Sequence, residues 1–331
     1  MVFGCAGERL GAAEARFFAA AHPLGFILFR RNCRAPDQVR ELVASLRDCL
    51  GRSDAPVLID QEGGRVARLV PPAWRRYPAA AAIAALPDPL AHEAARLGAR
   101  LIADDLERLG ISVACLPVLD LPVSGADPVI GDRAYGSNPD RVAVLGRAVC
   151  DGLLEGGVLP VLKHIPGHGR ARVDSHLAPP AVETGRLALS QTDFAPFRAL
   201  AGMPWAMTAH IIYMTIDRTA PATLSPRVIG EVIRKEIGFD GVLVSDDLSM
   251  RALPGSLGER ARLALAAGCD LVLHCNGDRA EMEEIAAASR PLDAAAAARL
   301  ARAAAMLRPP AAFGRRETER RFDALCAGPR G

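Results

Sequence analysis

A single segment concentrates the groups that could carry acid–base chemistry. It runs from Lys163 to His176, reads Lys-His-Ile-Pro-Gly-His-Gly-Arg-Ala-Arg-Val-Asp-Ser-His, and holds three of the seven histidines and one of only two lysines. Asp174 and His176 are two positions apart, so in an extended segment both side chains point to the same side. The carboxylate can then hold one imidazole nitrogen while the other nitrogen faces outward, as in an oriented general acid or base.

A pair of carboxylates forms the second candidate. Asp246 and Asp247 belong to the segment Ser245-Asp-Asp-Leu-Ser-Met250, which comes directly after an apolar run. Either could cap the next helix, but capping accounts for only one of them. A carboxylate opposite an acid/base group can cleave a glycosidic bond, because one group attacks the anomeric carbon and the other protonates the leaving oxygen. Histidine is an unusual acid/base here, yet its unperturbed pKa of about 6.5 suits the role. Arg68, Arg133 and Lys163 add donors for hydroxyl or carboxylate groups of a ligand.

Two other interpretations of the histidines stay open. His164, His168, Asp174 and His176 could form a metal site, although no pair has the helical i, i+4 spacing of the common zinc motifs. The histidines could also be ordinary loop residues that hydrogen-bond to the backbone.

Apolar runs alternate with helix-like segments along the chain. Runs rich in Val, Ile and Leu predict strands at residues 24–29, 56–59, 111–119, 158–162, 205–209, 241–244 and 271–274. Periodic apolar residues predict helices at residues 36–50, 90–109, 138–155 and 226–237. The alanine-rich residues 281–306 predict outer helices interrupted at Pro291, and residues 307–331 a C-terminal surface extension.

Near-continuous apolar strands separated by helices indicate parallel strands that are covered on both faces. The unit repeats without a linker, which predicts an α/β fold: residues 1–331 form one catalytic domain, a single (β/α)8 TIM-type barrel. Seven strands are identifiable and an eighth is not. A doubly wound open sheet is the alternative, but no Gly-x-Gly-x-x-Gly follows the first predicted strand.

Polar residues stand where the predicted strands end. They are Asp60, Asp120, Lys163, His164, His210 and Asp246. In a parallel barrel the C-terminal ends of the strands converge on the face where such folds do chemistry. We therefore expect these residues, distant in sequence, to share one pocket.

Composition limits the classes of partner. Half of the 331 residues are hydrophobic, the formal net charge is +2, and no run of like charges occurs. We therefore expect neither a nucleic acid nor a membrane as partner. No stretch resembles a signal peptide or a transmembrane span, which predicts a cytoplasmic protein. The eight cysteines include no Cys-x-x-Cys and are expected to be reduced thiols.

Five motifs together resemble the bacterial β-N-acetylglucosaminidases of glycoside hydrolase family 3. In chain order they are Asp60-Gln-Glu-Gly-Gly-Arg-Val-Ala-Arg68, Gly131-Asp-Arg-Ala-Tyr135, Lys163-His-Ile-Pro-Gly-His-Gly169, Asp174-Ser-His176 and Gly238-Phe-Asp-Gly-Val-Leu-Val-Ser-Asp-Asp-Leu-Ser-Met250. The similarity spans residues 23–276, most of the chain.

The resemblance implies a two-step retaining hydrolysis without cofactor or metal. Asp246 would be the nucleophile, and His176 the acid/base with Asp174 as its partner. The positions that would bind the terminal N-acetylglucosamine are Asp60, Arg68, Arg133, Lys163 and His164. The cytosolic members remove that sugar from anhydro-muropeptides during peptidoglycan recycling. The expected partner is thus a small carbohydrate, and we expect a monomer.

Three alternatives share these residues. A phosphorylase would pass the glycosyl group to phosphate, since a histidine acid/base carries no negative charge to repel the anion. Substrate-assisted catalysis would use the Asp246–Asp247 pair with the acetamido oxygen as nucleophile. A sugar-binding protein would have kept the barrel and lost turnover.

Overall fold

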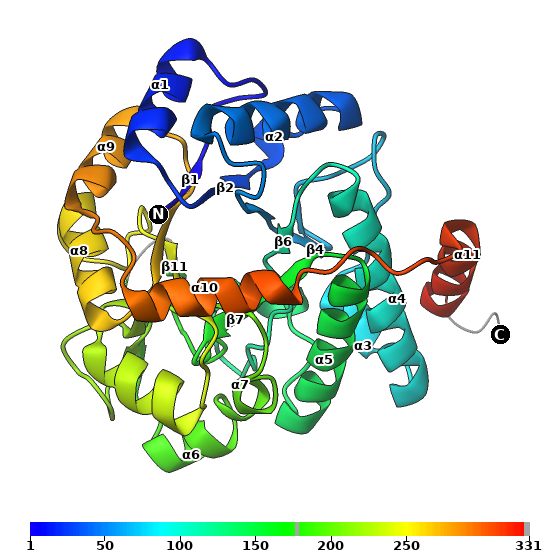
Figure 1. The fold of residues 1–331 in the computed structure, drawn as a ribbon. Coiled ribbons are helices and arrows are strands. Elements are labelled where there is room, and N and C mark those ends of the chain that lie inside the picture. The colour runs from blue at the N-terminus through cyan, green and yellow to red at the C-terminus, as the bar shows by residue number, and fades with distance from the viewer. Residues whose placement is uncertain (176–178, 328–331) are drawn as a thin grey trace.

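The computed structural model, in which residues 1–175 and 179–327 are described, contains a closed barrel of eight parallel strands (Figure 1). Around the barrel the strands follow the order β1-β12-β11-β9-β7-β6-β3-β2. They are β1 (Val2–Gly4), β2 (Gly25–Leu28), β3 (Val57–Ile59), β6 (Val113–Ala114), β7 (Leu159–Ile165), β9 (Trp205–Thr208), β11 (Val242–Asp247) and β12 (Leu271–His274). The predicted (β/α)8 architecture is confirmed, and the open-sheet alternative is wrong because the first and last strands pair.

The eighth strand is β1, at the start of the chain. Its three residues are fully buried, and Val2 pairs with Leu273 of β12 and with Gly25 of β2. Three residues are too few to show a strand periodicity, so the segment is recognisable only once the barrel closes around it.

Helices cover the outside of the barrel. They are α1 (Ala12–Ala21), α2 (Pro36–Leu50), α3 (Ala80–Ala84), α4 (Asp88–Glu107), α5 (Pro139–Glu155), α6 (Arg186–Gln191), α7 (Ala195–Ala199), the π-helix η4 (Val228–Glu236), α8 (Leu257–Ala267) and α9 (Arg279–Ala288). Pro36 and Pro139 stand in the first turns of their helices, where a missing N–H costs nothing. Among the described residues, no helix combines the length and apolar character that a bilayer span requires.

Short elements decorate the barrel ends. The strands β4 (Gln61–Gly63) and β5 (Val66–Ala67) form a hairpin, and β8 (Ala181–Val182) pairs with β10 (Ile212–Tyr213). The 3₁₀ turns η1 (Arg30–Asn32), η2 (Gly131–Arg133) and η3 (Ala222–Leu224) complete the loops.

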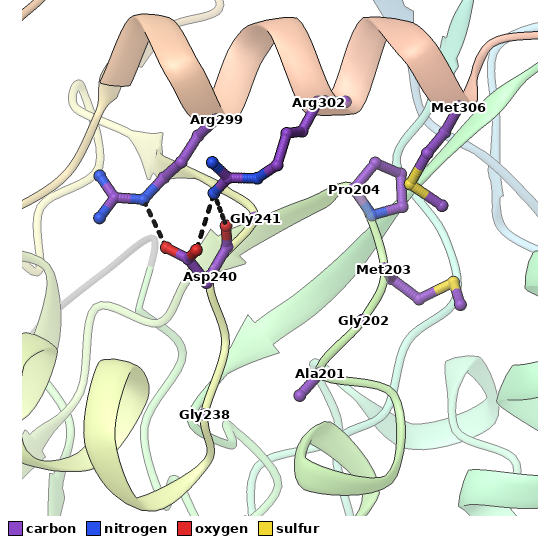
Figure 2. Close-up of a pocket in the computed structure, with 11 residues that line it drawn as sticks. Ala201, Gly202, Met203, Pro204, Gly238, Asp240, Gly241, Arg299, Arg302 and Met306 are labelled. Atoms are coloured by element: carbon purple, nitrogen blue, oxygen red, sulfur yellow. Dashed lines mark hydrogen bonds and ion pairs between the residues drawn. The ribbon is translucent and has the colours of Figure 1, made fainter. Parts of the chain in front are cut away.

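Helix α10 (Ala294–Met306) lies across the N-terminal end of the barrel, so its prediction as an outer helix is wrong (Figure 1). Ala303 packs against the barrel interior, and Arg299 and Arg302 bind the Asp240 carboxylate at 3.0 and 2.7 Å beside a hollow of about 350 Å³ (Figure 2). The alanine-rich face suits this position because small side chains let the helix approach the strand ends closely. With this end sealed, the opposite end holds the polar residues.

The predicted C-terminal surface extension contains helix α11 (Arg315–Cys326), which packs against the outside of the barrel. Phe322 is 1 % exposed, and a Cβ built on Gly98 of α4 would lie 2.8 Å from its ring. Arg315 binds Asp105 at 2.7 Å. The extension is therefore packed against α4 through an aromatic anchor and an ion pair.

Phe322→Ala is expected to lower the free energy of unfolding by about 3 kcal/mol, because it empties a buried aromatic site. Thermal and denaturant unfolding would measure the loss. Leu187→Ala is the control, since Leu187 is 73 % exposed and its truncation should change stability by less than about 0.5 kcal/mol. Equal stability of both variants would show that α11 contributes nothing to the fold.

Candidate active site

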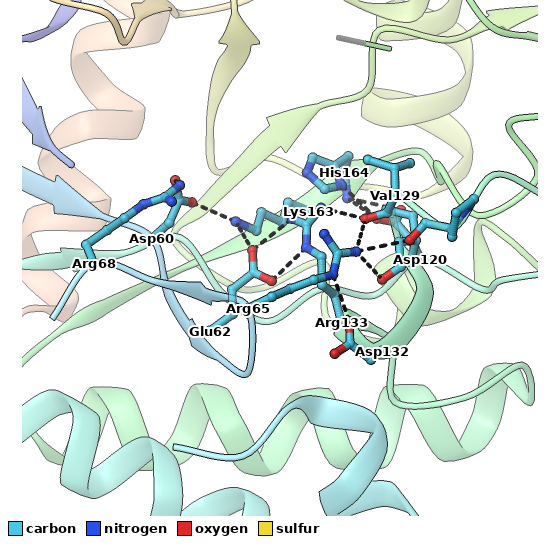
Figure 3. Close-up of polar contacts among 12 residues, drawn as sticks. Asp60, Glu62, Arg65, Arg68, Asp120, Val129, Asp132, Arg133, Lys163 and His164 are labelled. Carbon is cyan, nitrogen blue, oxygen red and sulfur yellow. Dashed lines mark hydrogen bonds and ion pairs between the residues drawn. The ribbon is translucent and has the colours of Figure 1, made fainter. Parts of the chain in front are cut away.

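A pocket lined by charged and apolar side chains opens at the C-terminal end of the barrel strands. Figure 3 shows polar contacts among several of its residues. The volume of the pocket is about 180 Å³. This lies below the roughly 300–1,000 Å³ of sites for drug-sized molecules, and suits one small ring better than an extended chain. Its lining residues are Ile27, Asp60, Glu62, Arg65, Val66, Arg68, Val129, Arg133, Lys163, His164, Met207, Asp246, Leu273 and Cys275.

Six of the eight predicted site residues line this one pocket. They are Asp60, Arg68, Arg133, Lys163, His164 and Asp246. They come from different strands and loops, as expected from the convergence of parallel strand ends. Two strand-end residues, Asp120 and His210, are fully buried and do not line it. Asp120 contacts His164, which does line the pocket, and His210 contacts the backbone of Asp247, next to Asp246.

Lys163 is the centre of the charge network. Its Nζ lies 2.8 Å from Asp60 Oδ1 and 2.6 Å from Glu62 Oε1, and the side chain is 2 % exposed. Burial alone would lower the lysine pKa, but the two carboxylates outweigh burial and raise it. Burial likewise would raise the pKa values of Asp60 and Glu62, and the neighbouring cations hold both below their usual range. All three groups are charged at neutral pH.

Two arginines extend the network to the pocket walls (Figure 3). Arg68 donates to Asp60 Oδ2 at 2.9 Å, while Arg133 binds both oxygens of Glu62 at 2.8 Å. A bidentate guanidinium–carboxylate pair fixes both orientations. The result is a rigid, preorganised set of donors and acceptors that matches the hydroxyl groups of a sugar.

Glu62 is the site residue that sequence reasoning missed. It lies two positions after Asp60, and both carboxylates reach Lys163. That i, i+2 spacing was the available signal, because alternate residues of an extended segment share a face.

His164 is held by a carboxylate behind it. Its Nδ1 lies 2.6 Å from Asp120 Oδ2, and its backbone N–H donates to Asp120 Oδ1 at 3.1 Å. Because a carboxylate only accepts, Nδ1 carries the proton. The other ring nitrogen, Nε2, takes no part in this bond. The His164 side chain itself lines the pocket.

Asp246 and Asp247 have different tasks. The Asp247 carboxylate accepts from the N–H and Oγ of Ser249 at 3.0 and 2.7 Å and from the N–H of Cys275 at 3.3 Å. Asp246 accepts the Asp247 N–H at 2.8 Å and lines the pocket. Burial would raise the pKa of Asp246, but His164 and this N–H hold it below its usual range. Asp247 is thus a local cap, and Asp246 is the ionised carboxylate that faces a ligand.

His210 supports the backbone at Asp247 from inside the protein. Its Nε2 lies 3.0 Å from the Asp247 carbonyl oxygen and its Nδ1 lies 2.7 Å from Thr223 Oγ1. Burial lowers the His210 pKa, so the ring is neutral; Nε2 donates to the carbonyl and Nδ1 accepts from the threonine hydroxyl.

The two remaining predicted residues belong to the loop after β7. Asp174 is half-buried there, and His176 lies outside the described residues. Their pairing stays a prediction. Within residues 1–175 and 179–327, no three His, Cys, Asp or Glu side chains come together as a metal site.

Glu62→Gln is expected to raise KM about tenfold, because the neutral amide loosens Arg133 and Lys163 and a charge-assisted hydrogen bond contributes about 1.5–3 kcal/mol. Asp132→Asn is the matched control. Its partner Arg65 sits at the rim with both side chains about half exposed, so KM should change less than about twofold. Steady-state kinetics on an aryl glycoside would measure KM for both variants. Equal changes in KM would show that Glu62 has no specific role in substrate binding.

Comparison with known proteins decides the family. The family described as "Glycosyl hydrolase family 3 N terminal domain" matches residues 9–306. The chain belongs to glycosyl hydrolase family 3. Among curated proteins, it is 42 % identical over 283 residues to a beta-hexosaminidase of Alkalilimnicola ehrlichii, covering 83 % of this chain and 80 % of that protein. It is also 42 % identical over 281 residues to a Pseudomonas aeruginosa beta-hexosaminidase, covering 84 % and 82 %.

Solved structures of the family share the whole barrel. NagZ from Neisseria gonorrhoeae in complex with N-trifluoroacetyl-D-glucosamine superposes with a TM-score of 0.85 at 33 % identity, covering 99 % of this chain and 96 % of that one. A family 3 beta-N-acetylglucosaminidase from Paenibacillus superposes with a TM-score of 0.86 at 32 % identity; the match covers 98 % of this chain and 66 % of that longer one. The resemblance identified from five motifs is thus confirmed, and this family 3 protein is a glycoside hydrolase of the β-N-acetylhexosaminidase class.

Proposed function

We propose that this family 3 enzyme is a retaining, exo-acting β-N-acetylglucosaminidase. In the first step an Asp246 oxygen attacks C1 of a terminal N-acetylglucosamine, the C1–O bond to the aglycone breaks, and His176 gives its proton to the departing oxygen. In the second step a water oxygen attacks C1, His176 takes the water proton, and Asp246 leaves as carboxylate. Asp174 holds the imidazole in orientation.

The observation that carries this proposal is the ionised Asp246 in the lining of a one-ring pocket that also holds a preorganised network of charged side chains. Asp60, Lys163 and Arg68 offer both acceptors and donors, as a ring with several hydroxyl groups requires. A pocket of about 180 Å³ has room for one terminal sugar ring, which favours exo action.

The physiological substrate follows from the family resemblance. We infer removal of N-acetylglucosamine from cell-wall fragments such as N-acetylglucosaminyl-1,6-anhydro-N-acetylmuramic acid and its peptides, in cytoplasmic peptidoglycan recycling, by a monomeric single-domain enzyme. The N-trifluoroacetyl-D-glucosamine bound by the Neisseria relative supports an acylated glucosamine in the pocket.

Release of nitrophenol from 4-nitrophenyl N-acetyl-β-glucosaminide by the purified protein tests the proposal, with phosphate present and absent. Turnover that is independent of phosphate and yields the β-anomer first supports the retaining hydrolase. Turnover that requires phosphate and releases N-acetylglucosamine 1-phosphate would replace it by a phosphorylase. Saturable binding of N-acetylglucosamine without any turnover would indicate a sugar-binding protein instead of an enzyme.

A further inference from the structure

The turn after strand β7 is a fixed platform in the C-terminal face of the barrel. The His168 N–H donates to Asp120 Oδ1 at 2.6 Å, and the Tyr213 hydroxyl donates to the Gly167 carbonyl. A Cβ on Gly169 would lie 2.0 Å from the Leu121 carbonyl oxygen, so backbone meets backbone there. The main chain around His168 is thus held by contacts with neighbouring segments, and the residue is 3 % exposed.

Ser175 is fastened to this platform. Its Oγ lies 3.0 Å from His168 Nε2, its carbonyl accepts the Ala252 N–H at 3.1 Å, and the residue is 2 % exposed. A buried polar side chain in a loop is unusual unless a specific partner holds it. Ser175 has one partner in the β7 turn and one after the β11 turn that carries Asp246.

The segment before Ser175 is fastened at its other end. Arg170 binds Asp193 at 2.7 Å and donates to Thr192 Oγ1 at 3.0 Å. Between these two attachments Arg172 and Val173 are exposed. Asp174 directly precedes the second attachment, so the Ser175 contacts hold the backbone next to it.

We propose that His168 and Ser175 are positioning residues that anchor the chain next to Asp174, the proposed partner of the acid/base in this enzyme. The inference rests on the proposed roles of Asp174 and His176, which flank Ser175 in the sequence. His168 touches no substrate in this scheme: it does not line the sugar pocket and acts through the Ser175 hydroxyl. Burial lowers the His168 pKa to about 4, so its ring is neutral and the contact persists across the working pH range.

A misplaced acid/base has a kinetic signature that a general loss of stability lacks. Proton donation matters most for leaving groups of high pKa and little for nitrophenolate. Azide attacks C1 of the glycosyl-enzyme without needing a base, giving the glycosyl azide and free Asp246 carboxylate.

The test compares Ser175→Ala and His168→Phe with wild type on 4-nitrophenyl N-acetyl-β-glucosaminide and on N,N′-diacetylchitobiose. We expect kcat/KM on the disaccharide to fall about 10- to 100-fold more than on the aryl glycoside. This is a part of the roughly 10²- to 10⁴-fold rate acceleration that general acid catalysis contributes. Azide should restore aryl-glycoside turnover and yield the glycosyl azide. Ser175→Thr and His168→Gln, which keep hydrogen-bonding groups, should recover most of the loss.

Ser225→Ala is the matched control. Ser225 is fully buried, and its Oγ contacts Asp217 at 2.6 Å and the Val228 N–H at 3.0 Å, away from the loop. Its loss should leave the ratio of the two substrates unchanged. An unchanged ratio and no azide effect in Ser175→Ala would overturn the proposal.

Amide hydrogen exchange keeps the inference separate from the proposed function. Loss of the contact should speed exchange at the Ala252 N–H and across residues 170–175 at least about tenfold in Ser175→Ala, with or without turnover. If the wild type hydrolyses no glycoside, the proposed function fails, while faster exchange still supports the anchor. Unchanged exchange would contradict the anchor itself.

Discussion

Asp246→Asn should lower kcat at least about 1,000-fold, because the amide keeps the shape of the carboxylate and loses the charge that attacks C1. Folding should be little affected, since the one backbone N–H that Asp246 accepts can still be accepted by the amide oxygen. Purified wild type and variant, compared on the aryl glycoside, provide the measurement.

Asp247→Asn is the matched control for the nucleophile. It makes the same change one residue away, on a carboxylate that Ser249 and Cys275 already occupy. We expect a loss of stability with kcat within about tenfold of wild type.

A 5-fluoro glycosyl fluoride should label Asp246 covalently, as mass spectrometry of peptides would show. A label on Asp247, or active Asp246→Asn, would refute the assignment, and absence of any adduct would favour the acetamido oxygen as nucleophile.

Lys163→Met should be the most destabilising substitution in the pocket. It leaves the carboxylates of Asp60 and Glu62 buried without the cation between them, and breaking such a pair costs about 3–5 kcal/mol. We also expect kcat/KM to fall at least about 100-fold, because both acceptors lose their orientation. Chemical denaturation and kinetics at pH 7 measure the two effects.

The destabilisation should depend on pH in a defined direction. In the wild type the pKa values of Asp60 and Glu62 lie below those of the unfolded chain, about 4. Their contribution is therefore present above pH 4 and is lost as pH falls through the lowered values. Without Lys163, burial moves both pKa values upward, so the stability difference between variant and wild type should be largest at pH 7 and shrink toward pH 4.

Lys235→Met is the control, since Lys235 is the only other lysine and is exposed on η4. The same substitution there should change stability by less than about 0.5 kcal/mol at either pH. A Lys163→Met difference that is constant with pH would show that the carboxylates are not what the lysine stabilises.

Much of the site was predictable because parallel strands place their ends together. Asp60, Lys163 and Asp246 each follow an apolar run, and that position alone predicts a shared pocket in a closed barrel. The helices at residues 36–50 and 138–155 were similarly predictable from local signals, since amphipathic spacing and an N-terminal proline act within a few residues.

The sequence by itself determined the fold class, the family and the strand-end residues, because these depend on local periodicity and on motifs that are contiguous in the chain. Only the tertiary structure decided that Val2–Gly4 closes the barrel, that Glu62 and Asp60 both form ion pairs with Lys163, and that Ser175 hydrogen-bonds to His168. The first two depend on partners far away in the sequence, and the third joins two loop positions seven residues apart that no regular helix or strand brings together. Burial and long-range pairing, which no local pattern encodes, determine which polar groups become structural and which are left to face a substrate.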